Sequence, residues 1–140
     1  MTVHNLAEYV AYHQRKLREQ SAQSSASSKS YGVNPIHSNS SFNTSVKQAS
    51  AGRVVLVDCF ATWCGPCKMI APKVSAMSQE EKYKDSVDFY KIDVDEVPDV
   101  AQELGIRAMP TFLVFKNGEQ VEEIVGANER AIRAAVDKHL

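Results

Sequence analysis

Apolar residues along the chain alternate between continuous runs and helical repeats, which predicts an α/β fold. The run 53–60 is rich in valine and apolar on both of its alternating faces, as expected of a strand that helices cover on two sides. In the segment after it, apolar residues recur at spacings of four and three, the repeat of one helix face: Ile70, Val74 and Met77. A strand is therefore followed directly by a helix.

The same patterns predict the other elements of a domain that begins near Gly32. In chain order they are an edge strand at 33–37, a short helix at 40–47, a strand at 87–93, a helix at 97–104, strands at 111–116 and 119–125, and a helix at 128–140. Asn117 and Gly118, between the last two strands, are the strongest short signal for a hairpin. Alternating strands and helices that end in a hairpin indicate a mixed sheet.

Residues 1–31 differ in composition and are predicted to be an N-terminal extension of the domain at 32–140. Residues 1–20 are compatible with a short helix, and six of residues 21–30 are serine, as in a flexible linker. The extension lacks the apolar region of a secretory signal. A leader that contains arginine and serine is typical of a mitochondrial transit peptide, so a mitochondrial location is the alternative to a cytoplasmic one.

Composition narrows the classes of function. Apolar residues make up 44% of the chain and the net charge is −1, which indicates neither nucleic acid nor a membrane as the partner. Three cysteines in 140 residues do not suggest a secreted scaffold held by disulfides.

Two cysteines, Cys64 and Cys67, stand where the predicted strand gives way to the predicted helix. A helix N-terminus favours a thiolate over a thiol, so Cys64 is expected to be nucleophilic. Cys67 lies one turn further along the same face, from which it can attack a disulfide formed at Cys64. Pro66 fits the first helical turn, where its missing N–H removes no hydrogen bond. The motif therefore predicts a redox dithiol.

Two other interpretations of the cysteine pair, a zinc site and a structural disulfide, have less support. A structural zinc site needs four ligands, and the chain offers one further cysteine and four histidines without a second paired motif, so no metal is expected. A structural disulfide across so short a loop would constrain little of the unfolded chain.

The residues around the dithiol, Val-Asp-Cys-Phe-Ala-Thr-Trp-Cys-Gly-Pro-Cys-Lys at 57–68, resemble the active-site stretch of thioredoxins. Four further segments match that family in order: 91–95, 108–112, 115–118 and 125–127. The resemblance covers roughly 33–140 and is closest to fungal members. It implies the thioredoxin fold, a central mixed sheet of five strands flanked by four helices.

The resemblance also implies a function, that of a protein-disulfide reductase that maintains cell redox homeostasis by dithiol–disulfide exchange. Cys64 would be the nucleophile and Cys67 the resolving cysteine, the two would form the redox disulfide, and Gly65 and Pro66 would support them. Electrons would come from NADPH through the flavoprotein thioredoxin reductase, with no cofactor bound to the chain. The expected targets are disulfide-containing proteins such as peroxiredoxins, methionine sulfoxide reductases and ribonucleotide reductase, and the protein is expected to be a monomer.

Asp58 is the next candidate, because an ionised carboxylate is costly inside an apolar strand. It is either a paired structural aspartate or a carboxyl with a raised pKa that accepts the proton of Cys67. The resemblance implies the second role. Cys59, its neighbour, should face the other way as a small buried apolar residue.

Pro110 is by sequence alone compatible with an ordinary proline at the start of a strand. The resemblance implies a cis bond between Met109 and Pro110 that lies against the dithiol, with the Met109 backbone pairing with an extended substrate segment. An apolar rim around Cys64 would bind the substrate: Trp63, Met109, Val125, Gly126 and Ala127.

Two other functions stay open. One is an oxidase or isomerase of the same fold, which Pro66 disfavours because the oxidising members usually carry histidine at that place. The other is a non-enzymatic docking protein that uses the apolar rim, with redox chemistry secondary.

Overall fold

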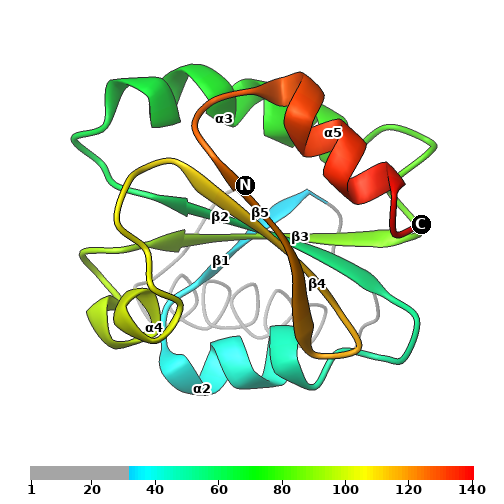
Figure 1. The fold of residues 1–140 in the computed structure, drawn as a ribbon, viewed down its shortest axis with the longest axis horizontal. Helices are drawn as coiled ribbons and strands as arrows, with labels where there is room; N and C mark the ends of the chain where they lie inside the picture. Colours follow the sequence, from blue (N-terminus) through cyan, green and yellow to red (C-terminus); the bar gives the residue numbers. More distant parts are fainter. Residues whose placement is uncertain (1–31) are drawn as a thin grey trace, which may run out of the picture. The chain divides into compact units, whose positions relative to one another are not determined.

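A five-stranded sheet with helices on both faces makes up the part of the chain that the computed structural model describes, residues 32–140 (Figure 1). The strands are β1 (Val33–Ile36), β2 (Val54–Phe60), β3 (Val87–Asp93), β4 (Thr111–Lys116) and β5 (Glu119–Val125). Their order in space is β1-β3-β2-β4-β5, with β1, β3 and β2 parallel and with β4 antiparallel to both β2 and β5. The expected mixed sheet is confirmed.

Helices cover both faces of this sheet. They are α2 (Asn39–Phe42), which continues into the π-helical turn η1 (Asn43–Lys47), α3 (Gly65–Ser78), α4 (Pro98–Glu103) and α5 (Glu129–Asp137). Figure 1 shows α3 and α5 on one face, with α2 and α4 on the other. The expected α/β architecture with four helices is therefore confirmed.

The helix over 39–47 differs from the ordinary helix that the sequence predicts at 40–47. In its second half the Gln48 N–H donates to the Asn43 carbonyl at 2.9 Å, so this turn is one residue wider than an α-helical turn. Phe42 and Val46 are both fully buried against the sheet. The widened turn thus belongs to a tertiary contact, which residue spacing alone does not encode.

The central strand β2 is buried along nearly its whole length, as its apolar sequence predicts. Val54 and Leu56 pack with residues of α3 and α5, whereas Val55, Val57 and Cys59 pack with residues of α2 and α4. Strand alternation places Asp58 on the same face as Leu56, under α3.

One end of the sheet gathers the segments that the sequence singles out. The parallel strands β2 and β3 both end there, β2 leads into the N-terminus of α3, β4 begins there after Pro110, and β5 ends there at Val125. Ligand and catalytic sites of open α/β sheets lie at this carboxyl end of the parallel strands. We call it the dithiol end.

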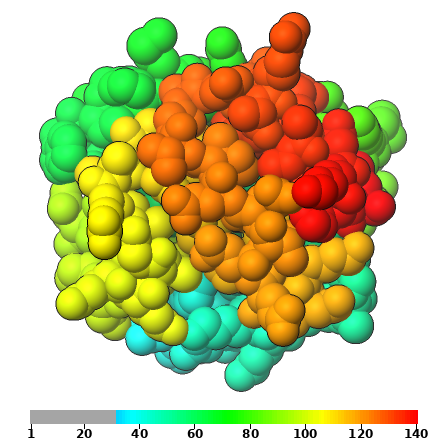
Figure 2. Space-filling model, viewed as in Figure 1, coloured from blue at the N-terminus to red at the C-terminus, as the bar shows by residue number. Residues whose placement is uncertain are grey.

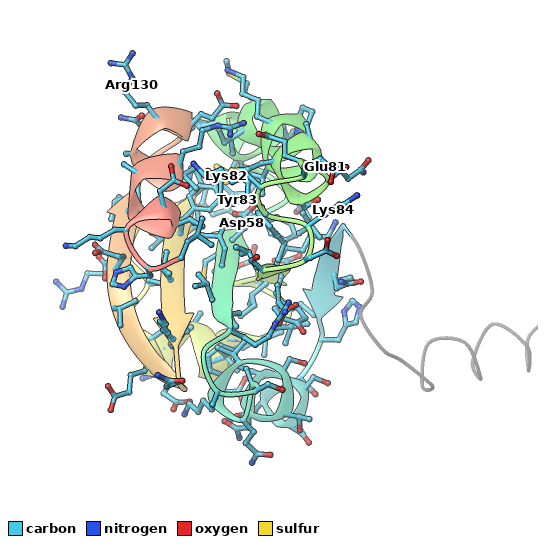
Figure 3. All side chains as sticks on the ribbon, turned by 90° about the vertical axis from the view of Figure 1, so that its right-hand side faces the viewer. Asp58, Glu81, Lys82, Tyr83, Lys84 and Arg130 are labelled. Carbon is cyan, nitrogen blue, oxygen red and sulfur yellow. A yellow bond between two sulfur atoms is a disulfide. The ribbon has the colours of Figure 1, made fainter. Side chains whose placement is uncertain are left out.

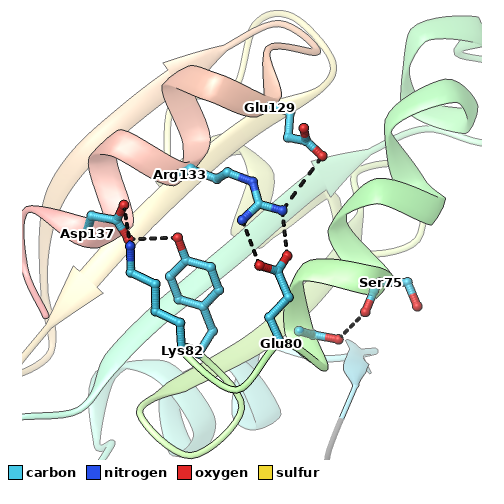
Figure 4. A network of polar contacts seen from close by, with 8 residues as sticks. Ser75, Glu80, Lys82, Glu129, Arg133 and Asp137 are labelled. Carbon is cyan, nitrogen blue, oxygen red and sulfur yellow. Dashed lines mark hydrogen bonds and ion pairs between the residues drawn. The ribbon is translucent and has the colours of Figure 1, made fainter.

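At the opposite end, polar contacts fasten α5 to the loop between α3 and β3, which carries Lys82 and Tyr83 (Figure 3). Figure 4 shows these contacts. Arg133 donates to both carboxylate oxygens of Glu80, at 2.9 and 2.5 Å. The Tyr83 hydroxyl donates to Asp137 at 2.7 Å, and the Lys82 ammonium lies 2.9 Å from the same carboxylate. We call these five residues the α5 clamp.

The two outer strands are irregular. Pro35 lies in the edge strand β1, where its missing N–H does not interrupt the hydrogen bonding of a central strand. On the other side, the pairing of β5 with β4 shifts register between Val114 and Phe115, and β5 lies on the surface in Figure 2.

The extension predicted at 1–31, with its helix and linker, lies outside the described residues, and its boundary with the domain stays a prediction. Among residues 32–140, no helix is long and apolar enough to cross a membrane.

Candidate active site

Cys64 and Cys67 form a disulfide at the start of α3, with their Cα atoms 5.3 Å apart. Cys64 is the N-cap of the helix and has extended backbone dihedrals. Its sulfur accepts the Cys67 backbone N–H at 3.2 Å, the place that a serine or aspartate oxygen takes in other caps. Pro66 follows in the first turn, where the sequence predicts it.

The N-cap hydrogen bond distinguishes the two sulfurs, whereas the exposure of the two cysteines is nearly equal. Cys64 and Cys67 are 5% and 4% exposed, so neither is freely open. Only the Cys64 sulfur receives a backbone N–H of the first turn, among the hydrogen bonds of residues 32–140. In the reduced protein this N–H and the helix dipole stabilise a thiolate at Cys64.

The segment around Pro110 lies directly against the dithiol. The Met109–Pro110 peptide bond is cis, and the Met109 carbonyl oxygen is 3.6 Å from the Cys64 sulfur. The Gly126 N–H donates to the Pro110 carbonyl at 2.8 Å, which ties the end of β5 to the start of β4. The start of β4 thus contacts the Cys64 sulfur and is itself held by the end of β5.

The residues predicted to form an apolar rim differ in exposure. Trp63 is 67% exposed and Val125 is 59% exposed, and Ala127 is also exposed. Met109 and Gly126 are half-buried. The structure therefore brings these residues to the dithiol end with two large apolar side chains open to solvent.

Asp95 also lies at the dithiol end, beside Trp63, and the sequence alone does not indicate this position. Its Oδ2 accepts the indole Nε1–H of Trp63 at 2.9 Å. The two residues are 32 positions apart, on the loops that follow β2 and β3. No local pattern indicates such a contact, but the pairing of β2 with β3 brings the two loops together.

Asp58 is 6% exposed, and Figure 3 shows it on the central strand β2, in the interior of the fold. Its Oδ1 has no hydrogen-bond partner among residues 32–140. Burial raises the pKa of Asp58 from the ordinary value of 3.8 to about 7, and the charge of Lys91 opposes this rise. Lys91 is exposed, and it is the register partner of Asp58 on β3.

A hollow of about 270 Å³ connects the carboxyl with the second cysteine. Asp58, Cys67 and Lys91 line it, together with Phe60, Ala61 and Ala71. The carboxyl of Asp58, the amine of Lys91 and the sulfur of Cys67 therefore share one solvent-accessible space.

Cys59 lies on the other face of β2 and is 1% exposed. Burial raises the pKa of its thiol to about 12, so it is protonated at neutral pH and unreactive. Within the described residues, no group of three or more histidine, cysteine or acidic side chains is arranged to hold a metal ion.

Comparison with known proteins agrees with this geometry. The family model described as thioredoxin matches residues 33–138. The chain belongs to the thioredoxin family. It is 49% identical to Thioredoxin Asp f 29 of Aspergillus fumigatus over 111 residues, which cover 79% of this chain and 98% of the relative. It is 52% identical to Thioredoxin-1 of Saccharomyces cerevisiae over 97 residues, which cover 69% and 88%.

Solved thioredoxin structures have the same fold. The thioredoxin of Malassezia sympodialis superimposes with a TM-score of 0.71 at 44% identity and covers 81% of this chain and 95% of that one. NaTrxh of Nicotiana alata gives 0.70 at 48% identity, with 81% and 97% covered. As a member of the thioredoxin family, the chain is a protein-disulfide reductase that exchanges dithiol and disulfide with target proteins and a reductase.

Proposed function

We propose that Cys64 is the nucleophile and Cys67 the resolving cysteine. The Cys64 thiolate attacks one sulfur of a target disulfide, forms a mixed disulfide and releases the first target thiolate. The Cys67 thiolate then attacks the Cys64 sulfur, which closes the Cys64–Cys67 disulfide and releases the second target thiol. The target gains two electrons and the protein loses two. The N-cap hydrogen bond to the Cys64 sulfur is the observation that supports this order.

Asp58 has the role of proton acceptor in the second step. Cys67 must lose its proton before it attacks, and Asp58 lines the same hollow with an oxygen that has no partner among residues 32–140. A pKa of about 7 allows this carboxyl to hold or release a proton near neutral pH. The proton passes directly or through water in the hollow.

The target docks on the rim beside Cys64. An extended segment pairs with the Met109 backbone, next to the sulfur, in the manner of strand addition. Trp63 and Val125 supply the exposed apolar contacts, with Pro110, Gly126 and Ala127 shaping the floor and edge.

Electrons come from NADPH through thioredoxin reductase. The chain then needs no bound cofactor, because exchange between sulfurs transfers two electrons without one. Peroxiredoxins, methionine sulfoxide reductases and ribonucleotide reductase are the proposed targets of a monomeric protein. One similar solved structure is described as the structural basis of the thiol resolving mechanism in yeast mitochondrial 1-Cys peroxiredoxin via glutathione and thioredoxin systems. This description supports peroxiredoxins as targets.

We place the protein in the cytoplasm, with mitochondria as the alternative. Cell fractionation of the full chain, followed by determination of its N-terminus, distinguishes the two. A shortened N-terminus in the mitochondrial fraction would identify residues 1–31 as a transit peptide and overturn the cytoplasmic assignment.

The test of the function is reduction of insulin with NADPH and thioredoxin reductase. The wild-type protein is expected to consume NADPH, and Cys64→Ser is expected to be inactive. Cys59→Ala is the matched control, because Cys59 is buried on the opposite face of β2, and it should retain activity. A wild-type protein without insulin reduction, or an active Cys64→Ser variant, would contradict the proposal and favour a docking protein.

A further inference from the structure

The indole of Trp63 is held by a hydrogen bond that sulfur exchange does not itself require. Its Nε1–H donates to Asp95 Oδ2 at 2.9 Å, although 67% of Trp63 is exposed. An exposed indole N–H can donate to water instead, so this bond adds little to folding stability. Its main consequence is orientation, because a ring that is tied at its polar end presents its apolar body in one place.

The acceptor is itself fixed to the sheet. The Asp95 N–H donates to Asp93 Oδ1 at 2.9 Å, and Asp93 is the last residue of β3. The next residue, Val94, donates its N–H to the Phe60 carbonyl of β2 at 2.9 Å. The Val97 N–H returns to the Asp93 carbonyl at 3.0 Å and closes the turn. Asp95 is therefore a rigid support for Trp63.

We propose that Asp95 is a positioning residue for target docking: its carboxylate holds Trp63 in place so that a disulfide-containing protein segment meets an already ordered apolar ring. This inference rests on the docking role proposed above for Trp63. Ordering a mobile side chain upon binding weakens association, by roughly three- to tenfold for one such group. A small disulfide that reaches only the sulfur has no contact with the ring and is unaffected.

The chain has a single tryptophan, so fluorescence anisotropy excited at wavelengths that tyrosine does not absorb reports on Trp63 alone. In Asp95→Ala the anisotropy should fall, and the KM for insulin in the presence of excess reductase should rise about fivefold with kcat unchanged. The rate with the small disulfide reagent DTNB should stay at the wild-type value. Asp95→Asn keeps an oxygen that accepts the indole N–H, and it should restore both anisotropy and KM.

Trp63→Phe provides a second variant, because it keeps an aromatic ring but lacks the N–H donor. Its KM for insulin should also rise, and adding Asp95→Ala to it should cause no further rise, since the bond is already absent. Additive effects of the two changes would overturn the proposal.

Three other results would overturn it. They are an unchanged anisotropy in Asp95→Ala, a lowered anisotropy with an unchanged insulin KM, and an Asp95→Asn variant as impaired as Asp95→Ala, which would assign the effect to charge. A wild-type protein that does not reduce insulin would instead contradict the proposed function, and so the two failures are distinguishable.

Discussion

The dithiol end and the α5 clamp lie at opposite ends of the same sheet. They differ in whether their polar side chains have hydrogen-bond partners. In the clamp, Arg133 and Glu80 pair through two hydrogen bonds, and Tyr83 donates to Asp137. At the dithiol end, the buried Asp58 has an oxygen without a partner among residues 32–140. Buried polar groups are normally hydrogen-bonded, so an unpaired carboxyl oxygen beside the dithiol supports the proton-acceptor role proposed for Asp58.

The two ends also respond to pH with opposite signs. The folded-state pKa of Asp58 lies above its ordinary value, so its contribution makes the folded state less stable as pH rises from 3.8 to about 7. The hydrogen bonds from Arg133 hold the pKa of Glu80 below its ordinary 4.5. That contribution is complete above pH 4.5 and is lost as pH falls through the folded-state pKa. The pKa shift at the dithiol end thus costs stability at neutral pH, whereas the shift in the clamp contributes to it.

The largest expected effect is that of Cys67→Ser, which removes the resolving thiol while Cys64 remains nucleophilic. Mixed disulfides with target proteins should accumulate, and catalytic turnover should be lost. Non-reducing gels of the variant incubated with oxidised insulin test this, with Cys64→Ser as the control. Adducts in Cys64→Ser but not in Cys67→Ser would reverse the two assigned roles.

Asp58→Asn should stabilise the protein at neutral pH while impairing the reaction. The amide carries no charge, so the variant avoids the penalty that corresponds to the raised pKa, at most about 4 kcal/mol. The gain should shrink as pH falls from about 7 and should vanish below 3.8, where the wild-type carboxyl becomes neutral in the unfolded state as well. The resolving step should be at least about tenfold slower, because an amide accepts no proton from Cys67.

Urea melts at acid and neutral pH, together with single-turnover reduction of a model disulfide, measure both effects of Asp58→Asn. Lys91→Met is a matched control for charge, since it removes the ammonium beside Asp58 and leaves the carboxyl. A variant that is less stable at neutral pH and equally fast would make Asp58 a paired structural residue.

Tyr83→Phe tests the clamp alone. The variant loses the hydrogen bond to Asp137, whose carboxylate keeps its contact with Lys82, so the free energy of unfolding should fall by about 1 kcal/mol. Insulin reduction should be unchanged at temperatures where the variant is folded. Impaired reduction in a fully folded variant would show that the two ends are coupled.

Arg133→Met should have the smallest effect. The methionine lacks the guanidinium, which pairs with Glu80 and lies 5.9 Å from the centre of the Tyr83 ring, and partly exposed ion pairs are worth at most about 1 kcal/mol. The difference from wild type should shrink in acid as Glu80 becomes protonated. Urea midpoints at pH 7 and at a series of pH values below 4.5 measure it, and a difference that does not shrink in acid would mean that the contact with Tyr83, not the ion pair, carries the effect.

The sequence predicts the strands and the cysteine motif better than the clamp, because these features follow from local patterns. The Asn117–Gly118 turn sets the bounds of β4 and β5, and the structure has both strands at the predicted residues. The cysteine motif marks the junction of β2 and α3, which the structure confirms. These features depend on neighbours within a few positions.

The contacts that the sequence does not reveal join residues far apart in the chain. The clamp pairs residues 53 and 54 positions apart, and Trp63 lies 32 positions from Asp95. Charged residues on α5 are compatible with any solvated helix face until the fold selects their partners. The cis bond at Pro110 is likewise no property of the local residues, and only the family resemblance indicates it.

The irregular outer strands β1 and β5 disfavour pairing with extended segments of target proteins, here called clients. A protein that docks extended chains at Met109, as proposed above, is itself at risk of pairing with them along an exposed edge strand. Pro35 interrupts the donors of β1, and the register shift beside Val114 disturbs the straight course of β5, which also carries the exposed charges of Glu119 and Glu123. In the docking proposed above, an oxidised client therefore pairs at the Met109 backbone rather than along these two outer strands, and it is released when the Cys64–Cys67 disulfide closes.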